Sequence, residues 1–240
     1  MDKSHPLPGP ARAQQVRTTS IPPAQSRNGT APNEAEPIVF VVDDDEAVRN
    51  GLKRLLKSAS YHVEVFASAE EFMRRERYEG PACLLLDVYL PGLNGLDLQK
   101  ALAAADYPLP IVFITGHGDV PMSVGAMKAG AADFLTKPFG DDRLIKALGD
   151  ALAKSRKERS ARAELALIKQ RLSRLTPRED EVLNHVVAGK LNKNIAAELK
   201  ISLKTVKVHR AQVMHKMKVE SLAQLVRDVQ QVGIPKRPGG

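Results

Sequence analysis

IVFVVDDD, residues 38–45, joins an unbroken apolar run to three consecutive aspartates. A continuous run rich in β-branched residues is typical of a strand that is buried on both faces of a sheet. Four later segments share this character, and each is separated from the one before by a helical pattern. These segments are HVEVF (62–66), ACLLLD (82–87), IVFIT (111–115) and DFLT (133–136). The first segment is therefore expected to be one strand of a parallel sheet.

The intervening helical patterns indicate the fold class. They cover residues 46–58, 68–76, 94–105 and 120–129, and a fifth begins near Asp141. Strands that alternate with helices at this spacing predict an α/β fold, a (βα)5 doubly wound parallel sheet with helices on both faces. Right-handed crossovers place the loops that follow the strands along one edge of the sheet, which is where such sheets bind ligands.

Composition divides the 240-residue chain into segments of different character. Residues 1–36 contain six prolines and few large apolar side chains, so we expect a disordered tail there. We expect the α/β domain at residues 37–152, a helical linker at 153–170 and a small all-α domain at 171–235.

The net charge of +8 is unevenly distributed. Over residues 37–153 acidic side chains outnumber basic ones by 17 to 12, whereas from residue 154 onward basic side chains lead by 20 to 8. A basic second half favours a polyanionic partner, nucleic acid before a membrane. The two halves are therefore expected to have different partners.

Several classes of protein are excluded by what the sequence lacks. The single cysteine, Cys83, rules out an internal disulfide framework and a Cys-rich zinc site. No apolar run approaches the ~18 residues of a membrane span, and the N-terminus lacks the apolar core of a secretory signal. We therefore expect a cytoplasmic protein without a membrane partner.

Polar side chains gather at the expected carboxyl edge of the sheet. Asp43 and Asp44 follow the first strand, Asp87 ends the third, Thr115 ends the fourth and Lys137 follows the fifth. Converging carboxylates need a cation, and oxygen ligands without His or Cys favour Mg²⁺. An ammonium and a hydroxyl beside them can hold phosphoryl oxygens. A single Asp here would be explained equally well as a helix cap, but the combination at successive strand ends points to a phosphoryl site.

These motifs resemble those of a known family. VVDDD, LLLDVYLPGLNGLDL and FITGHGDVPMSVGAMKAGAADFLTKPF look like a bacterial response-regulator receiver domain, and GHGDVP and MKAGA look like its FixJ type. The resemblance implies that Asp87 accepts a phosphoryl group from a sensor histidine kinase. It also implies that Asp43, Asp44 and Asp87 bind Mg²⁺ together with the backbone carbonyl of Tyr89.

The same resemblance implies which residues respond to phosphorylation. Thr115 and Lys137 would contact the phosphoryl oxygens, and Phe134 would be the aromatic switch. The Lys137–Pro138 peptide bond is expected to be cis. The surface formed by residues 120–152 is then expected to change shape and to form a homodimer.

The second domain is expected to begin at a helix-start signal. Thr176-Pro177-Arg178-Glu179 fits a capping box, with Thr176 as N-cap and Glu179 as its partner. A short helix, a tight turn and a longer helix follow, which is the helix-turn-helix arrangement, at about residues 192–211. The four helices are expected at 177–188, 193–199, 203–217 and 221–232.

The longest of these helices, 203–217, has two distinct faces on a helical wheel. Val206, Val213 and Met217 share the face that we expect in the core. The opposite face has basic side chains at its ends and small side chains at its centre. It can therefore enter a major groove and reach phosphates or guanine edges. A helical bundle with a solvated lysine face would show the same pattern. The residues of this face are Lys204, Lys207, Val208, Ala211, His215 and Lys218.

This domain also resembles a known family. LTPREDEVL, GKLNKNIAAEL and ISLKTVKVHRAQVMHKM look like the LuxR/NarL-type helix-turn-helix domain, over about residues 171–235. By this resemblance Lys207, Val208 and Ala211 face the bases of double-stranded DNA. Residues near the helix N-termini are placed for backbone phosphates: Asn192, Lys193 and Thr205.

Two further patterns concern packing. Leu165, Ile168, Leu172 and Leu175 recur at helical spacing, and they form either a short dimer seam or a stripe that docks on the second domain. Arg210 lies about 40° from Val206 on an α-helical wheel, hence toward the interior. We expect it to pair with Glu179 or another acid of the first helix of that domain.

Together these expectations describe a phosphorylation-dependent transcription regulator of a two-component system. The phosphorylated receiver dimerises and the basic domain binds paired promoter half-sites; the resemblance favours activation, with RNA polymerase as a further candidate partner. An aspartyl-phosphate phosphatase is the rival enzyme, but it needs a second Asp where this chain has Tyr89, so we expect no enzymatic turnover. Two further rivals are a receiver used only for docking and an adaptor that binds proteins.

Overall fold

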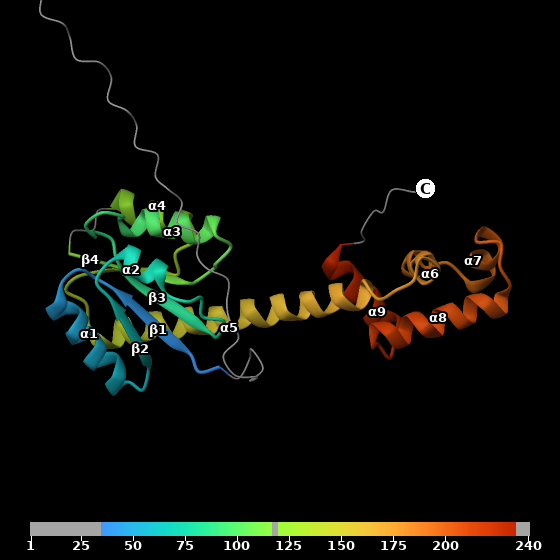
Figure 1. Ribbon diagram of the computed structural model, residues 1–240, viewed down its shortest axis with the longest axis horizontal. Coiled ribbons are helices and arrows are strands. Elements are labelled where there is room, and N and C mark those ends of the chain that lie inside the picture. Colours follow the sequence, from blue (N-terminus) through green and yellow to red (C-terminus); the bar gives the residue numbers. More distant parts are fainter. Residues whose placement is uncertain (1–34, 117–119, 234–240) are drawn as a thin grey trace, which may run out of the picture. The chain divides into compact units, whose positions relative to one another are not determined.

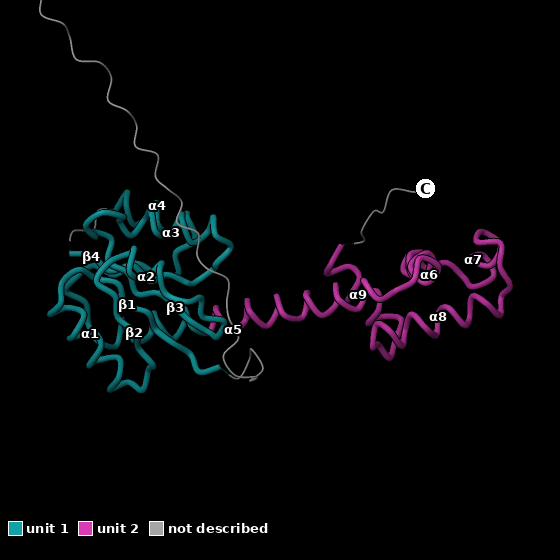
Figure 2. Tube along the Cα trace, in the orientation of Figure 1, with its two compact units in different colours: residues 1–152 teal, residues 153–240 magenta. Residues whose placement is uncertain are grey.

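The computed structural model describes residues 35–116 and 120–233. The chain divides after Leu152 into two compact units (Figure 2). The tail predicted at residues 1–36 lies outside the described residues except for its last two positions.

A five-stranded sheet forms the centre of the first unit (Figure 1). The strand order is β2-β1-β3-β4-β5 and every neighbouring pair is parallel. The predicted strands are all present with the predicted bounds, so the α/β fold class is confirmed. The strands are β1 (Ile38–Val42), β2 (His62–Phe66), β3 (Ala82–Asp87), β4 (Ile111–Thr115) and β5 (Asp133–Thr136).

Helices cover both faces of this sheet and bury alternate residues of the strands. Phe40 packs in a cluster with residues of α2, α3 and α4, whereas Val39 and Val41 pack with residues of α1 and α5. Both clusters are almost fully buried, which explains why the strands have continuous apolar runs. The helices are α1 (Glu46–Ser58), α2 (Ala69–Arg74), α3 (Gly95–Ala104), α4 (Val120–Lys128) and α5 (Asp141–Leu172).

Helix α5 begins in the first unit and ends in the second (Figure 1). Ile168 is buried in the core cluster of the second unit, and Leu172 and Leu175 pack against the same cluster. The guanidinium of Arg171 donates a hydrogen bond to the carbonyl oxygen of Met217 at 3.0 Å. Of the two roles expected for this apolar stripe, the structure therefore supports docking on the second domain.

Four helices follow in the second unit, and side-chain caps set the starts of three of them. Thr176 and Glu179 form the predicted capping box at the first, and Ser202 and Ser221 cap the last two. Val206, Val213 and Met217 are buried, so their predicted place in the core is confirmed. The helices are α6 (Pro177–Val187), α7 (Asn192–Glu198), α8 (Leu203–Met217) and α9 (Leu222–Val232).

The predicted partner of Arg210 is wrong. Arg210 Nη1 donates a hydrogen bond to Asn192 Oδ1 at 3.0 Å, across the helix-turn-helix. Glu179 instead accepts a hydrogen bond from Lys216 Nζ at 2.6 Å. The helical wheel correctly placed Arg210 toward the interior. Its partner depends on where α6 and α7 cross α8, which the wheel does not give.

The single cysteine, Cys83, is fully buried in β3, and burial raises the pKa of its thiol. Among the described residues, no helix is both long enough and apolar enough to cross a membrane.

Candidate functional site

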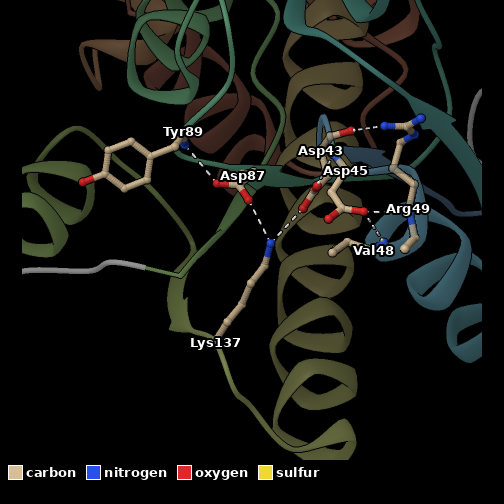
Figure 3. A network of polar contacts seen from close by, with 8 residues as sticks. Asp43, Asp45, Val48, Arg49, Asp87, Tyr89 and Lys137 are labelled. Carbon is tan, nitrogen blue, oxygen red and sulfur yellow. Dashed lines mark hydrogen bonds and ion pairs between the residues drawn. The ribbon is translucent and has the colours of Figure 1, made fainter.

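Two buried carboxylates share one ammonium at the carboxyl edge of the sheet (Figure 3). Lys137 Nζ lies 2.9 Å from Asp43 Oδ2 and 2.8 Å from Asp87 Oδ2. Val42 of β1 pairs with Leu86 of β3, so the residues that follow them, Asp43 and Asp87, lie side by side. The parallel sheet thus brings together three side chains that are far apart in the sequence.

The burial of this group determines its electrostatics. Asp43 is 1% exposed and Asp87 is 7% exposed, while the side chain of Lys137 remains 26% exposed. Two acidic side chains face one ammonium, so the formal charge of the group is negative in a partly desolvated site. Such a site attracts a cation or the positively polarised part of a ligand.

The pKa values of two members of the group are shifted by these surroundings. Burial raises the pKa of Asp43, although its hydrogen bonds to Lys137 and Asp45 act in the opposite direction. Burial alone would lower the pKa of Lys137, but the hydrogen bonds and charges of Asp87 and Asp43 outweigh it and raise that pKa. The lysine is therefore held in its charged form.

Backbone amides fix the second oxygen of each buried carboxylate. Asp43 Oδ1 accepts a hydrogen bond from the Asp45 amide at 3.0 Å, and Asp87 Oδ1 accepts one from the Tyr89 amide at 2.9 Å. Each carboxylate is thus held between its own loop and Lys137, as Figure 3 shows. This leaves little rotational freedom at the two acids.

The three aspartates after β1 have different surroundings. Asp43 is buried in the polar group described above. Asp45 is the N-cap of α1, where its carboxylate accepts from the amides of Ala47 at 2.7 Å and Val48 at 3.2 Å. Asp44 is exposed, and its carboxylate forms no hydrogen bond or ion pair with the described residues. Asp44 is therefore the aspartate left available to a ligand.

The expected metal ligands agree with Mg²⁺ in their chemistry but do not surround a common point. Within the two described stretches, no three His, Cys, Asp or Glu side chains come together closely enough to hold a metal ion. Lys137 Nζ lies between the two buried carboxylates instead. The donors are all oxygens and carry a net negative charge, which fits a hard divalent cation. The residues therefore fit Mg²⁺ by donor type.

The predicted phosphoryl-contact and switch residues lie at the ends of β4 and β5. Thr115 is fully buried, and its backbone carbonyl accepts a hydrogen bond from the Lys137 amide at 2.7 Å. Phe134 is half-buried, and its ring centroid lies 6.1 Å from that of Phe113. The Lys137–Pro138 peptide bond is cis, as predicted. Tyr89, after β3, is 52% exposed.

Two side chains that the sequence analysis did not single out hold the loops of this site. Arg49 Nη1 of α1 donates a hydrogen bond to the backbone carbonyl of Asp43 at 2.7 Å. Glu70 Oε1 of α2 accepts one from the amide of Leu93, in the loop after Asp87, at 3.2 Å. In the sequence, Arg49 is recognisable as the first basic residue after three consecutive aspartates. The bond of Glu70 has no such local signal, because its partner Leu93 lies 23 residues further along the chain.

A glycine is required where this loop meets α3. A Cβ atom at Gly95 would lie 2.4 Å from the backbone carbonyl oxygen of Asp87, a distance that real Cβ atoms do not show. The absence of a side chain at Gly95 thus allows α3 to begin directly against the end of β3.

The second candidate site is the exposed face of α8. The residues predicted opposite the core face are all exposed, and Val208 is 53% exposed. This face therefore has a solvent-accessible apolar centre between basic ends, at Lys204, Lys207, Val208, Ala211, His215 and Lys218.

The residues expected to meet phosphates lie at the N-termini of α7 and α8. Lys193 is exposed in the first turn of α7, and the neighbouring Asn192 is half-buried and accepts the hydrogen bond of Arg210. The hydroxyl of Thr205, in the first turn of α8, shares a hydrogen bond with Ser202 at 2.7 Å. Asn192 and Thr205 thus have structural contacts of their own.

Comparison with protein families identifies both units. Residues 39–149 match the response regulator receiver domain, and residues 173–229 match the bacterial regulatory proteins of the luxR family. The first match contains Asp43, Asp87 and Lys137, and the second contains the exposed face of α8.

Individual relatives match most of the chain. Nodulation protein W of Bradyrhizobium diazoefficiens is 44% identical over 210 residues, which are 88% of this chain and 92% of that protein. The transcriptional regulatory protein FixJ of the same organism is 42% identical over 82% of this chain and 96% of its own length. The solved structure of the response regulator StyR is 48% identical, has a TM-score of 0.76, and is matched over 82% of this chain and 100% of StyR.

Proposed function

Since the chain belongs to the response regulators that join a receiver domain to a LuxR-family DNA-binding domain, we propose that phosphorylation of Asp87 controls its binding to promoter DNA. The predicted family is thereby confirmed, and because its members are transcription regulators, so is the prediction that the chain is not an enzyme. A receiver domain implies a histidine kinase as partner, and a helix-turn-helix domain implies DNA.

The arrangement of Asp43, Asp87 and Lys137 is the observation that carries this proposal. Asp87 ends β3 at the ligand-binding edge of the sheet, with one oxygen held by a backbone amide and the other by Lys137 Nζ at 2.8 Å. Lys137 orients the Asp87 carboxylate, and a nucleophilic carboxylate requires such a fixed position. When the ammonium turns toward an incoming phosphoryl group, it can neutralise one of its oxygens.

The phosphoryl transfer that we propose is a single in-line displacement. An Asp87 carboxylate oxygen forms a bond to phosphorus while the bond from phosphorus to the histidine nitrogen of the kinase breaks. Asp43, Asp44, Asp87 and the carbonyl of Tyr89 would hold Mg²⁺, which supplies positive charge to the phosphoryl oxygens when it is bound. Lys137 and the Thr115 hydroxyl would contact the remaining oxygens.

The output of this step is a change at the surface of residues 120–152. The new phosphoryl charge draws the Thr115 hydroxyl toward it, and the half-buried Phe134 moves into the space that this leaves. Three exposed apolar residues on one side of α4, Val120, Val124 and Met127, support this surface as the place where two receivers pair. Phosphorylation would then favour a homodimer.

The DNA-binding part of the proposal places the exposed face of α8 in the major groove. Lys207, Val208 and Ala211 would face bases, and phosphates would be contacted by Asn192, Lys193, Lys204 and Thr205. Dimers would bind paired half-sites and activate transcription in the cytoplasm, with RNA polymerase as a further partner.

The domain limits of this proposal are those of the sequence analysis. The receiver covers residues 37–152, the linker 153–170 and the DNA-binding domain 171–235. The family matches at 39–149 and 173–229, and the division after Leu152, support these limits.

Intact mass after incubation with acetyl phosphate and Mg²⁺ tests the assignment of Asp87. We expect one phosphoryl group on the wild type and none on Asp87→Asn, which removes the nucleophilic oxygen but keeps the size of the side chain. Asp97→Asn, which changes a half-buried acid of α3, is the control and should accept one group. If folded wild-type protein gained no phosphoryl group, the receiver would serve only for docking and DNA binding would have to be independent of phosphorylation.

A further inference from the structure

The acidic turn between β1 and α1 is clamped by a side chain of the helix that it precedes. Arg49 Nη1 donates a hydrogen bond to the backbone carbonyl oxygen of Asp43 at 2.7 Å (Figure 3). Arg49 is half-buried and lies one turn after the N-cap residue Asp45, whose carbonyl accepts the Arg49 amide at 3.0 Å. The arginine thus reaches back from α1 to the last residue before the bend.

The other hydrogen bonds of this turn act on neighbouring atoms. The Asp43 amide donates to the carbonyl of Phe66 at 3.3 Å, which ties the turn to β2. The Asp43 carboxylate accepts the Asp45 amide at 3.0 Å. The carbonyl that joins Asp43 to Asp44 is therefore held by Arg49, and this peptide unit sets the direction in which the Asp44 side chain leaves the backbone.

An arginine suits this role better than other cations. Its side chain is long enough to reach across a helical turn, and its guanidinium is rigid and always charged. Hydrogen bonds from charged donors are stronger than those from neutral ones. It also lies beside four consecutive acidic residues, 43–46, whose mutual repulsion would otherwise loosen the turn.

Arg49 has two opposing effects on a divalent cation. Its positive charge repels the cation, so charge alone predicts that removing the arginine strengthens binding. Its hydrogen bond holds the turn in one conformation. This positioning effect predicts that removing the arginine weakens binding of the cation. The sign of the change therefore separates the two effects.

We propose that Arg49 is a positioning residue for Mg²⁺: by holding the Asp43 carbonyl, it orders the turn that carries Asp43 and Asp44. The donor type and net negative charge of these acids fit the ion, and Arg49 itself is not a ligand. This inference rests on the proposed function, because it concerns the same receiver site.

Isothermal titration of the full-length, unphosphorylated protein with Mg²⁺ tests the inference. We expect Arg49→Met to weaken Mg²⁺ binding about 10-fold, the lower range for removing a residue that orients metal ligands. The control is Arg54→Met, which removes an exposed cation from the same helix and should bind as the wild type does. Equal or tighter binding by Arg49→Met would overturn the inference, because the charge would then be the dominant effect.

A second variant keeps the inference testable if Arg49→Met does not fold. Arg49→Lys retains the charge but has a shorter side chain without the planar fork, so we expect binding between those of the wild type and Arg49→Met. Binding equal to the wild type by Arg49→Lys would then count against a positioning role. Circular dichroism of each variant establishes that it is folded before the titration.

The phosphorylation rate at saturating Mg²⁺ provides an independent readout. We expect Arg49→Met to reach the wild-type rate with acetyl phosphate once the metal is saturating, since Asp87, Thr115 and Lys137 are unchanged. A rate that stayed low would show that Arg49 acts on the phosphoryl chemistry and would overturn the inference. Absence of Mg²⁺ binding by the wild type would instead overturn the proposed function, and this outcome is distinguishable from the others.

Discussion

Lys137 is the counter-charge of the two buried carboxylates, Asp43 and Asp87. Replacing it by Met leaves Asp43 and Asp87 facing one another without a counter-charge, so we expect the receiver to lose about 2–3 kcal/mol of unfolding free energy at pH 7. The loss should shrink toward pH 4, because burial raises the pKa of Asp43 and its carboxyl group, once protonated, no longer repels Asp87. In the wild type, the raised pKa of Lys137 means that its stabilisation is present below pH 10.5 and lost as the pH rises through the higher folded value.

Urea unfolding followed by circular dichroism at pH 7 and pH 4 measures this effect. Lys100→Met is the matched control, because Lys100 forms only an exposed ion pair with Asp97. It should change the free energy of unfolding by less than about 0.5 kcal/mol. An equal loss for Lys137→Met at both pH values would contradict the electrostatic explanation.

Glu179 gives the stability of the second unit a pH dependence opposite to the one that Lys137 gives the receiver. Burial would raise the pKa of Glu179, but hydrogen bonds from Lys216 and Thr176 outweigh it and lower that pKa below the ordinary value of 4.5. The corresponding stability is present above pH 4.5 and is lost as the pH falls through the folded value. We expect Glu179→Gln to cost about 1–3 kcal/mol at pH 7 and less below pH 4.

Hydrogen exchange of the amides in α6 and α8 reports this change within the full-length protein. The exposed Glu220 of the segment before α9 provides the control, because Glu220→Gln should leave the protection of both helices unchanged. Unaltered protection in Glu179→Gln at pH 7 would argue against the pair with Lys216 as a source of stability.

At the scale of elements, the end of α5 belongs to the core of the second unit. Ile168 is 3% exposed and packs in that core, whereas its neighbour Leu167 is 51% exposed. We expect Ile168→Ala to destabilise the second unit by about 2–4 kcal/mol, because it leaves a cavity. Hydrogen exchange of α6 and α8 measures this, with Leu167→Ala as a near-neutral control. A change in oligomeric state without a loss of protection would point to a dimer seam instead.

Helix α4 is a weakly held element. It has Pro121 in its first turn and Gly125 in its interior, and Ala126 is its buried residue in the described structure. Glycine in a helix interior and few buried contacts both lower local stability. An element of this kind can shift at small energetic cost, which agrees with the proposed surface change at residues 120–152.

At the scale of the whole molecule, we expect phosphorylation, dimerisation and DNA binding to be separable. Val124→Asp places a charge in the exposed apolar stripe of α4, so the variant should accept a phosphoryl group normally but remain monomeric. Its DNA affinity should then match that of the unphosphorylated wild type. Light scattering and DNA titration at fixed salt measure the two properties.

Leu167→Asp is the control for this prediction, since it adds the same charge at an exposed leucine of α5. It should dimerise on phosphorylation as the wild type does. Normal dimerisation by Val124→Asp would exclude the α4 surface as the pairing site and would place dimerisation elsewhere on the protein.

Most local structure follows from the sequence, because it depends on neighbours within a few residues. The apolar runs determined the five strands, and the caps at Thr176, Ser202 and Ser221 determined where helices begin. The order of polar residues at the strand ends was sufficient to expect Asp43, Asp87 and Lys137 at one edge. Parallel strands allow this, since every strand brings its carboxyl end to the same side.

Only the tertiary structure decided which distant side chains meet. In the folded protein Glu179 pairs with Lys216, and Arg210 pairs with Asn192. Ile168 packs in the core of the second unit. Arg49 donates a hydrogen bond to the carbonyl oxygen of Asp43. A helical wheel establishes which face a residue occupies. It does not establish where that face crosses its neighbour, and a shift of one turn, about 5.4 Å, exceeds the reach of any hydrogen bond. Partners across elements are therefore determined by packing, not by local sequence.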